Sequence, residues 1–228
     1  MRAVGLDFGQ TLAELDYEFV ARRLREQACA FDPVSAAECS ERAWDVYGRK
    51  KREGHAAGWL AMMEEQLRGG GVPEARVREL AAWLWSEQPR KNLWRRPIPG
   101  MIELVRELRQ RAVPLAIISN SEGHLPELVA ELGWADDFDA VVDSGRLGID
   151  KPDPRIFQHA CAALAVPTTE LLHVGDSWEA DVSGALGASA SAVWFDARHR
   201  ERALPDRVYG ASSAEELREV LARLGLLS

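Results

Sequence analysis

After residue 100, short apolar runs alternate with amphipathic segments, and this alternation restricts the possible folds more than any other feature of the sequence. The pattern predicts helices over 100–111, 122–132, 154–165 and 177–187, and strands over 113–118, 139–142, 170–174 and 191–195. Strands that alternate with helices are joined by right-handed crossovers and therefore run parallel. The predicted fold class is α/β, with a Rossmann-like parallel sheet between layers of helices.

The N-terminal run RAVGLDF, at 2–8, adds one more strand, because it is apolar and ends in a carboxylate. A helical block separates this strand from the others. Its helices are predicted over 17–31, 35–53, 56–68 and 73–87. We therefore expect an α/β core domain of residues 1–14 and 95–228, with an inserted all-helical cap subdomain of residues 15–94.

The charge of the chain restricts its partners. Its 228 residues carry a net charge of −8, and residues 15–94 contain 13 basic and 13 acidic residues, so the whole excess belongs to the predicted core. This balance disfavours binding to nucleic acid or to an anionic membrane. Three cysteines without a CxxC pair, and no apolar run long enough to span a membrane, indicate a cytoplasmic protein. The expected partner is a small molecule, and the chain is expected to be a monomer or a homodimer.

Polar side chains stand at the ends of the predicted strands, where parallel sheets bind their ligands. They are Asp7, Ser119, Asn120, Lys151, Asp176 and Asp181. Taken singly each is a weak signal, since an aspartate after a strand is as often a helix cap and a lone lysine is usually solvated. Together they match one chemistry. The carboxylates suit a hard cation such as Mg²⁺, while Ser119 and Lys151 suit the oxygens of a phosphoryl group.

Four segments in this order resemble the signature of the haloacid dehalogenase (HAD) superfamily of hydrolases, in the branch whose helical cap lies between the first and second motifs. They are GLDFGQTL, IISNS, GIDKPDPRIF and HVGDSWEADVSGALGA, and the resemblance covers nearly the whole chain. It implies that Asp7 is the nucleophile and forms an aspartyl-phosphate that water hydrolyses. It also implies that Ser119 binds a phosphoryl oxygen and that Lys151 pairs with Asp7 and the phosphoryl group.

The resemblance implies a Mg²⁺ site as well. Asp7, Asp176 and the main-chain carbonyl of Gly9 would hold the ion, and Asp181 would act from just outside these ligands or as an additional anchor. Gly9, Thr11 and Asn120 are expected to contact the substrate.

One position departs from the family pattern. The phosphatases of this superfamily have a first motif D-x-D-x-T, whose second aspartate is the general acid and base. The corresponding residues of this chain are Asp7, Phe8, Gly9, Gln10 and Thr11, so that carboxylate is missing. A positioned acid or base contributes about a hundredfold to ten-thousandfold to the rate.

Three interpretations of the gap remain open. The chain is a phosphatase that relies on water, on the substrate or on another carboxylate such as Glu14 or Asp16. Alternatively, it expels a leaving group that needs no proton, as the haloacid dehalogenases do; a phosphonate-cleaving variant would need a cap lysine, for which Lys50 and Lys51 are poor candidates. Finally, it is a binding or regulatory module with little turnover. We favour the phosphatase, because Asp176 occupies a metal-ligand position.

Other conspicuous residues have structural interpretations. Five of the eight tryptophans lie in the helical block, where packing is the commoner role. Trp178 is expected to border the site. His173 lies within a predicted strand, and we expect it to be buried and hydrogen-bonded.

Overall fold

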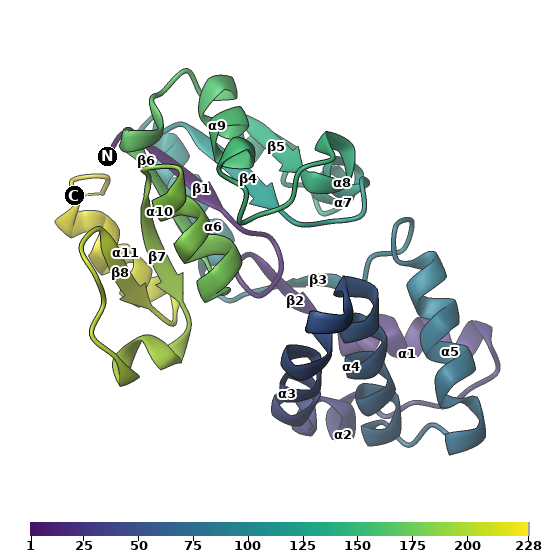
Figure 1. The fold of residues 1–228 in the computed structure, drawn as a ribbon. Coiled ribbons are helices and arrows are strands. Elements are labelled where there is room, and N and C mark those ends of the chain that lie inside the picture. Colours follow the sequence, from purple (N-terminus) through teal and green to yellow (C-terminus); the bar gives the residue numbers. More distant parts are fainter. Residues whose placement is uncertain (228) are drawn as a thin grey trace. The chain divides into compact units, whose positions relative to one another are not determined.

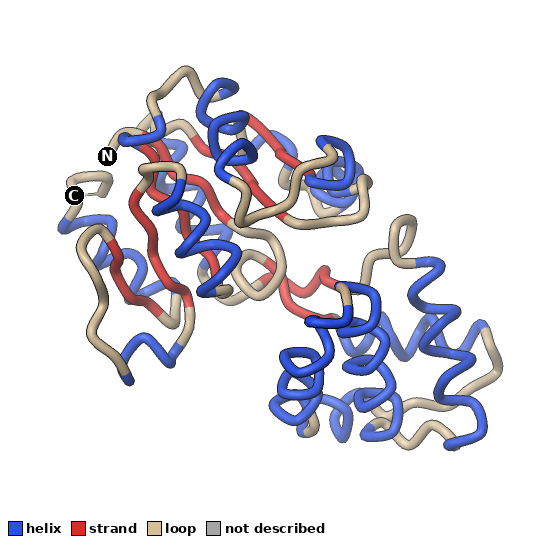
Figure 2. Tube along the Cα trace, viewed as in Figure 1, coloured by secondary structure: helices blue, strands red, loops and turns tan. Residues whose placement is uncertain are grey.

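The computed structural model describes residues 1–227, without the side chains of Lys51 and His55. Its main sheet has the strand order β5-β4-β1-β6-β7-β8, and all neighbouring strands are parallel. The strands are β1 (Ala3–Leu6), β4 (Leu115–Ser119), β5 (Ala140–Asp143), β6 (Leu171–Gly175), β7 (Ser191–Phe195) and β8 (Val208–Ala211). Helices lie on both faces of this sheet (Figures 1 and 2). The α/β fold class predicted from the sequence is confirmed.

The structure contains the four helices predicted for this part of the chain, with shorter bounds, and two further helices. They are α6 (Met101–Gln110), α7 (Leu125–Glu131), α8 (Ser144–Leu147), α9 (Pro154–Ala163), α10 (Gly184–Gly187) and α11 (Ala214–Arg223). The helix predicted over 177–187 divides into a π-helical turn, η4 (Trp178–Ser183), and α10. Short 3₁₀ turns lie at η2 (Ala135–Asp137), η3 (Thr168–Glu170) and η5 (Ala197–Glu201).

The central strands are buried along their whole length. Every residue of β1, β4, β6 and β7 is buried. This is the pattern of a parallel sheet covered on both faces, and it explains why these strands read as continuous apolar runs. The side chains of α9 and α10 pack against one face through Phe157, Cys161 and Ala185.

Three strands were not predicted. The edge strand β8 has the sequence VYGA, and its Gly210 leaves room for the imidazole of His199, since a Cβ there would lie 2.3 Å from His199 Cδ2. A second, two-stranded sheet pairs β2 (Ala13–Leu15) with β3 (Trp94–Pro97). Strands β2 and β3 are too short and too polar to give a strand pattern in the sequence.

The chain divides into two compact units, residues 1–14 with 95–228 and residues 15–94. The second unit contains α1 (Tyr17–Glu26), α2 (Pro33–Glu38), α3 (Ser40–Lys50), η1 (Lys51–Glu53), α4 (His55–Gly69) and α5 (Glu74–Glu87). The helix expected over 35–53 is broken at Cys39, the C-cap of α2. Trp59 is buried and packs against the rings of Trp85 and Trp94, at 5.1 and 6.4 Å between centroids. In the described part of the chain, no helix has the length and apolar character needed to cross a membrane.

Asp143 holds the turn that follows β4. It is the last residue of β5 and lies in register with Ser119. Its Oδ1 accepts hydrogen bonds from Ser121 Oγ (2.7 Å) and from the main-chain N–H groups of Gly123 (3.1 Å) and Gly145 (2.9 Å). Its Oδ2 accepts from Leu125 N at 2.9 Å. Both oxygens of one buried carboxylate thus fix the segment that leaves the end of β4.

We predict that Asp143→Asn destabilises the protein by about 1–3 kcal/mol, because the new amide group would face a main-chain N–H and leave a buried donor unpaired. Denaturant unfolding measures this loss. The exposed Asp136 provides the matched control, and Asp136→Asn is expected to change stability by less than about 0.5 kcal/mol. Equal stabilities of the two variants would contradict this role of Asp143.

Candidate active site

Three neighbouring strands bring the predicted residues to one edge of the sheet. Asp7 follows β1, Ser119 ends β4, and Asp176 follows β6. Because β4, β1 and β6 are adjacent and parallel, their carboxyl ends meet at this edge. Asp7 is fixed there by its main-chain N–H, which donates to Val174 O at 2.8 Å. The edge is the expected ligand-binding position of such a sheet.

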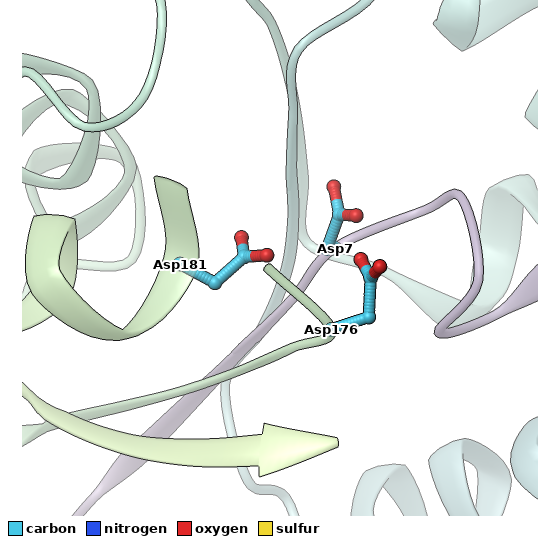
Figure 3. A group of neighbouring side chains, drawn as sticks. All are labelled: Asp7, Asp176 and Asp181. Carbon is cyan, nitrogen blue, oxygen red and sulfur yellow. The ribbon is translucent and has the colours of Figure 1, made fainter. Parts of the chain in front are cut away.

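Asp7, Asp176 and Asp181 form an acidic cluster. One oxygen of each carboxylate lies within 4.8 Å of the others. Figure 3 shows the carboxylates of Asp7 and Asp176 side by side, with that of Asp181 approaching from η4. Oxygen donors at this spacing suit a hard divalent cation. The residues therefore fit the Mg²⁺ site that the sequence predicted.

Lys151 joins two members of this cluster. Its buried ammonium donates to Asp7 Oδ1 at 2.7 Å, to Asp181 Oδ1 at 2.6 Å and to the main-chain oxygen of Ile118 at 2.8 Å. These three bonds use all of its protons. The ammonium is thus held directly beside the predicted nucleophile.

The buried charged groups shift one another's pKa values. Burial raises the pKa of Asp7 and outweighs the opposing effect of the Lys151 ammonium. Burial and the negative charges of Asp181 and Asp7 raise the pKa of Asp176 well above its usual range. Burial opposes ionisation of Asp181 too, but Lys151 and the hydrogen bond with His173 hold its pKa below the usual range. Lys151 stays charged, since the carboxylates raise its pKa despite burial. Repulsion between Asp7 and Asp176 is what a bound cation would relieve.

Asn120 has a contact that sequence reasoning did not foresee. Its Oδ1 accepts from Lys151 N at 2.7 Å, and its Nδ2 donates to Lys151 O at 3.0 Å. Both ends of the carboxamide therefore hydrogen-bond to the main chain of Lys151, whose side chain carries the ammonium. The proposed contact of Asn120 with substrate stays a prediction.

The loop after Asp7 is a tight turn. Phe8 O accepts from both Leu12 N and Ala13 N, at 2.9 Å each, and Gly9 bridges to Ala13. Thr11 is fully buried, and within the described residues its Oγ1 has no hydrogen-bond partner. Contact of Gly9 or Thr11 with a substrate, and of the Gly9 carbonyl with a metal, remain predictions.

Glu14 and Asp16, the two carboxylates named as replacements for the missing acid, each make a hydrogen bond of their own. Glu14 pairs with Arg96 across the two-stranded sheet, with Oε1 2.8 Å from Nε. Asp16 is the N-cap of α1, and its Oδ1 accepts from Phe19 N at 2.8 Å. These bonds give both groups structural roles.

Glycine, tryptophan and arginine residues around the carboxylates also shape the site. Gly175 is needed for close approach, because a Cβ there would lie 2.2 Å from Asp181 Cγ. Trp194 donates from Nε1 to the main-chain oxygen of Asp176 at 2.9 Å. The ring of Trp178 meets Trp194 edge to face at 4.9 Å, and the guanidinium of Arg202 stacks on it at 3.8 Å. The sequence shows Gly175 after an apolar run, but it does not show that the side chain packed against this glycine is that of Asp181, six residues later.

The sequence of the chain is similar to those of known hydrolases. A sequence model described as "haloacid dehalogenase-like hydrolase" matches residues 1–189. A phosphoserine phosphatase of Thermus thermophilus is 36% identical over 163 residues, which are 68% of this chain and 63% of that protein. A pyrimidine 5'-nucleotidase of Escherichia coli is 33% identical, over 56% of this chain and 57% of that protein. The chain thus spans about three fifths of these two relatives.

A dehalogenase is also among the relatives. The (S)-2-haloacid dehalogenase of Pseudomonas putida is 31% identical over 128 residues, or 54% of each protein. The relatives therefore include both phosphatases and a dehalogenase.

Solved structures share the fold. A HAD hydrolase of Bacillus subtilis, solved with magnesium, has a TM-score of 0.69 at 21% identity and covers 96% of this chain and 98% of its own. A HAD family hydrolase of Deinococcus radiodurans, solved with phosphate and sodium, has a TM-score of 0.64 at 23% identity and covers 100% and 98%. With the sheet order, the acidic edge and the matched family model in agreement, the chain belongs to the haloacid dehalogenase-like hydrolases.

Proposed function

We propose that the chain is a Mg²⁺-dependent phosphatase that acts on a small phosphorylated metabolite through an aspartyl-phosphate on Asp7. The observation that carries this proposal is the position of Asp7, whose Oδ1 lies 2.7 Å from the Lys151 ammonium beside the carboxylate of Asp176. One carboxylate oxygen is thus held by a cation, while the other oxygen is available for attack. The phosphatase and nucleotidase among the relatives support a phosphorylated substrate.

Asp7 and Asp176 would hold the Mg²⁺, together with the Gly9 carbonyl, and Asp181 would act mainly through Lys151. Both oxygens of Asp181 already accept hydrogen bonds, from Lys151 and His173 on Oδ1 and from Ser177 N on Oδ2. Bound Mg²⁺ would neutralise the charge of the carboxylates and of the phosphoryl group.

In the first step, an oxygen of Asp7 attacks phosphorus, a new P–O bond forms, and the bond from phosphorus to the leaving oxygen breaks. Ser119 binds a phosphoryl oxygen, and the positive charge of the Lys151 ammonium beside Asp7 stabilises the charge that develops on the phosphoryl group. In the second step, water attacks phosphorus, the bond to Asp7 breaks, and the products are inorganic phosphate and the free carboxylate. The leaving oxygen takes a proton from solvent in the first step, and water loses one to solvent in the second.

The gap at Gly9 makes the proton transfers the slow part of this scheme. Glu14 and Asp16 already bond to Arg96 and to the first turn of α1, which favours structural roles for both. Substrates whose leaving group needs little protonation are therefore favoured.

A dehalogenase is the second candidate, because halide leaves without a proton and a relative of this chain is a 2-haloacid dehalogenase. In that reaction Asp7 would attack carbon and release halide. Clustering of Asp176 with Asp7 argues for the phosphatase, since attack on carbon gives no use for a cation site. A binding or regulatory role without turnover is the third interpretation.

With an activated aryl phosphate, we expect Mg²⁺-dependent phosphate release that Asp7→Asn lowers by more than about a thousandfold, since the amide cannot form the covalent intermediate. The assay is steady-state phosphate release with Mg²⁺ or with a chelator. Asp136→Asn is the control and keeps wild-type activity. If the wild type instead releases halide from 2-haloacids in the presence of a chelator, and no phosphate, the dehalogenase interpretation replaces the phosphatase.

Restoring the acid tests the gap directly. We expect Gly9→Asp to raise the rate with alkyl phosphates about tenfold or more, as a positioned general acid does. Gly9→Asn has nearly the same shape without a proton to donate, and we expect no such gain from it. An unchanged rate in a folded Gly9→Asp variant, or an equal gain with asparagine, would show that proton transfer is not the limitation.

The raised pKa of Asp176 predicts how pH acts on the metal-free protein. Because folding raises this pKa, the folded chain binds the proton more tightly than the unfolded chain does. The resulting stability is complete at pH values below the unfolded carboxyl range and is lost as the pH rises through the folded value. Asp176→Asn removes this loss. We therefore expect the variant to gain stability over the wild type with rising pH, and the gain to vanish near pH 3.

Urea unfolding with a chelator, from pH 3 to pH 8, measures this difference. Added Mg²⁺ should stabilise the wild type at the higher pH values more than it stabilises Asp176→Asn. A difference between the two proteins that does not change with pH would refute the role given to Asp176.

A further inference from the structure

His173 lies in the middle of β6, directly behind the acidic cluster. Its side chain is fully buried, and its Nε2 is 2.9 Å from Asp181 Oδ1. The ring of Phe157 meets it edge to face, with centroids 5.0 Å apart. On the neighbouring strand β1, a Cβ at Gly5 would lie 2.8 Å from Ile118 Cδ1 and 3.3 Å from His173 Nδ1, so the glycine leaves space for both side chains. The expectation that His173 is buried and hydrogen-bonded is confirmed.

The hydrogen-bond geometry assigns the proton of the ring. Asp181 Oδ1 can only accept, so the nitrogen that faces it is the donor. Within the described residues, Nδ1 has no hydrogen-bond partner. A bare lone pair at Nδ1 costs less than a buried N–H without an acceptor. The arrangement therefore places a proton on Nε2 and aims it at Asp181.

The same oxygen of Asp181 also holds Lys151. Asp181 Oδ1 accepts from both His173 and Lys151, while Oδ2 accepts from Ser177 N at 2.9 Å. These bonds on two sides fix the plane of the carboxylate. The Lys151 ammonium is in turn fixed by Asp181, by Ile118 O and by Asp7. A continuous chain of bonds thus leads from His173 to the nucleophile.

We propose that His173 is a positioning residue for the reaction inferred above: its Nε2–H holds the Asp181 carboxylate in the orientation that keeps the Lys151 ammonium on Asp7. The proposal rests on the proposed phosphatase function. Within the described residues, the side-chain hydrogen bonds of Asp7 do not include His173, and a fully buried ring in the centre of the sheet does not meet the substrate. Without the donor, the Asp181 carboxylate turns more freely, and Lys151 loses its fixed position beside the attacking oxygen.

The alternative is that His173 only fills space between β1 and α9, and three variants separate the two roles. His173→Leu removes the donor but keeps an apolar side chain. His173→Gln offers an N–H that can reach Asp181. Phe157→Leu disturbs the same packing from the other side, and the phenyl ring carries no polar atom that could hydrogen-bond to the site.

Kinetics with Mg²⁺ and an aryl phosphate form the first arm of the experiment. We expect His173→Leu to lower kcat by about 10- to 100-fold, the usual effect of removing an outer partner of a site carboxylate, and to change KM much less. His173→Gln should recover most of kcat. Phe157→Leu should lower the thermal midpoint and leave kcat within about twofold of the wild type. A His173→Leu variant that loses stability but keeps kcat, as Phe157→Leu does, would overturn the proposal.

The second arm does not depend on turnover. In ¹⁵N-labelled protein without substrate, the ring of His173 should show a proton on Nε2 that exchanges slowly with solvent, and Asp181→Asn should shift this resonance. Assignment to His173 comes from its loss in His173→Gln. A ring proton on Nδ1, or a resonance that Asp181→Asn leaves unchanged, would overturn the proposal. If the wild type releases no phosphate, the proposed function fails, and the resonance alone then decides the link between His173 and Asp181.

Discussion

The buried ammonium of Lys151 is the interaction on which the site depends. Carboxylates as close as Asp7 and Asp181 would repel each other strongly in a low-dielectric interior, and burying a single cation would be costly as well. The carboxylates and the ammonium stabilise one another in the interior only if their positions are fixed. The carboxamide of Asn120 grips the main chain of Lys151, and Ile118 O accepts its third proton. The fold thus holds these buried charged groups in fixed positions.

Rigidity of this kind follows from the parallel sheet. Its central strands are buried on both faces, so each strand end is fixed by the packing of the whole element. Close approach then needs residues without side chains. Gly175 lets the carboxylate of Asp181 lie against the end of β6, and Gly5 leaves space that the side chains of Ile118 and His173 occupy. Glycines thus determine how near the charged groups come, although they carry no chemistry themselves.

The fold and the acidic cluster were readable in the sequence because each leaves a local signal. Buried parallel strands appear as apolar runs, and the residues after them stand at a known edge. The supporting contacts leave no such signal. The four hydrogen bonds of Asp143, the grip of Asn120 on Lys151 and the bond from Trp194 to Asp176 O join residues between 2 and 31 positions apart. Strand β8 was not predicted, because VYGA is short and contains Gly210. The reason for this glycine is its packing against His199, which only the structure shows.

The missing carboxylate at position 9 also affects the net charge of the site. Asp7, Asp176 and Asp181 with Lys151 leave two negative charges, which one divalent cation would balance. A fourth carboxylate at position 9, in the ionised form, would add a charge that repels a phosphoryl dianion. On the proposed function, its absence therefore favours binding of the dianion while it slows protonation of the leaving group. The two effects act on different steps, so this chain should bind phosphoryl groups well and select substrates by the acidity of what they release.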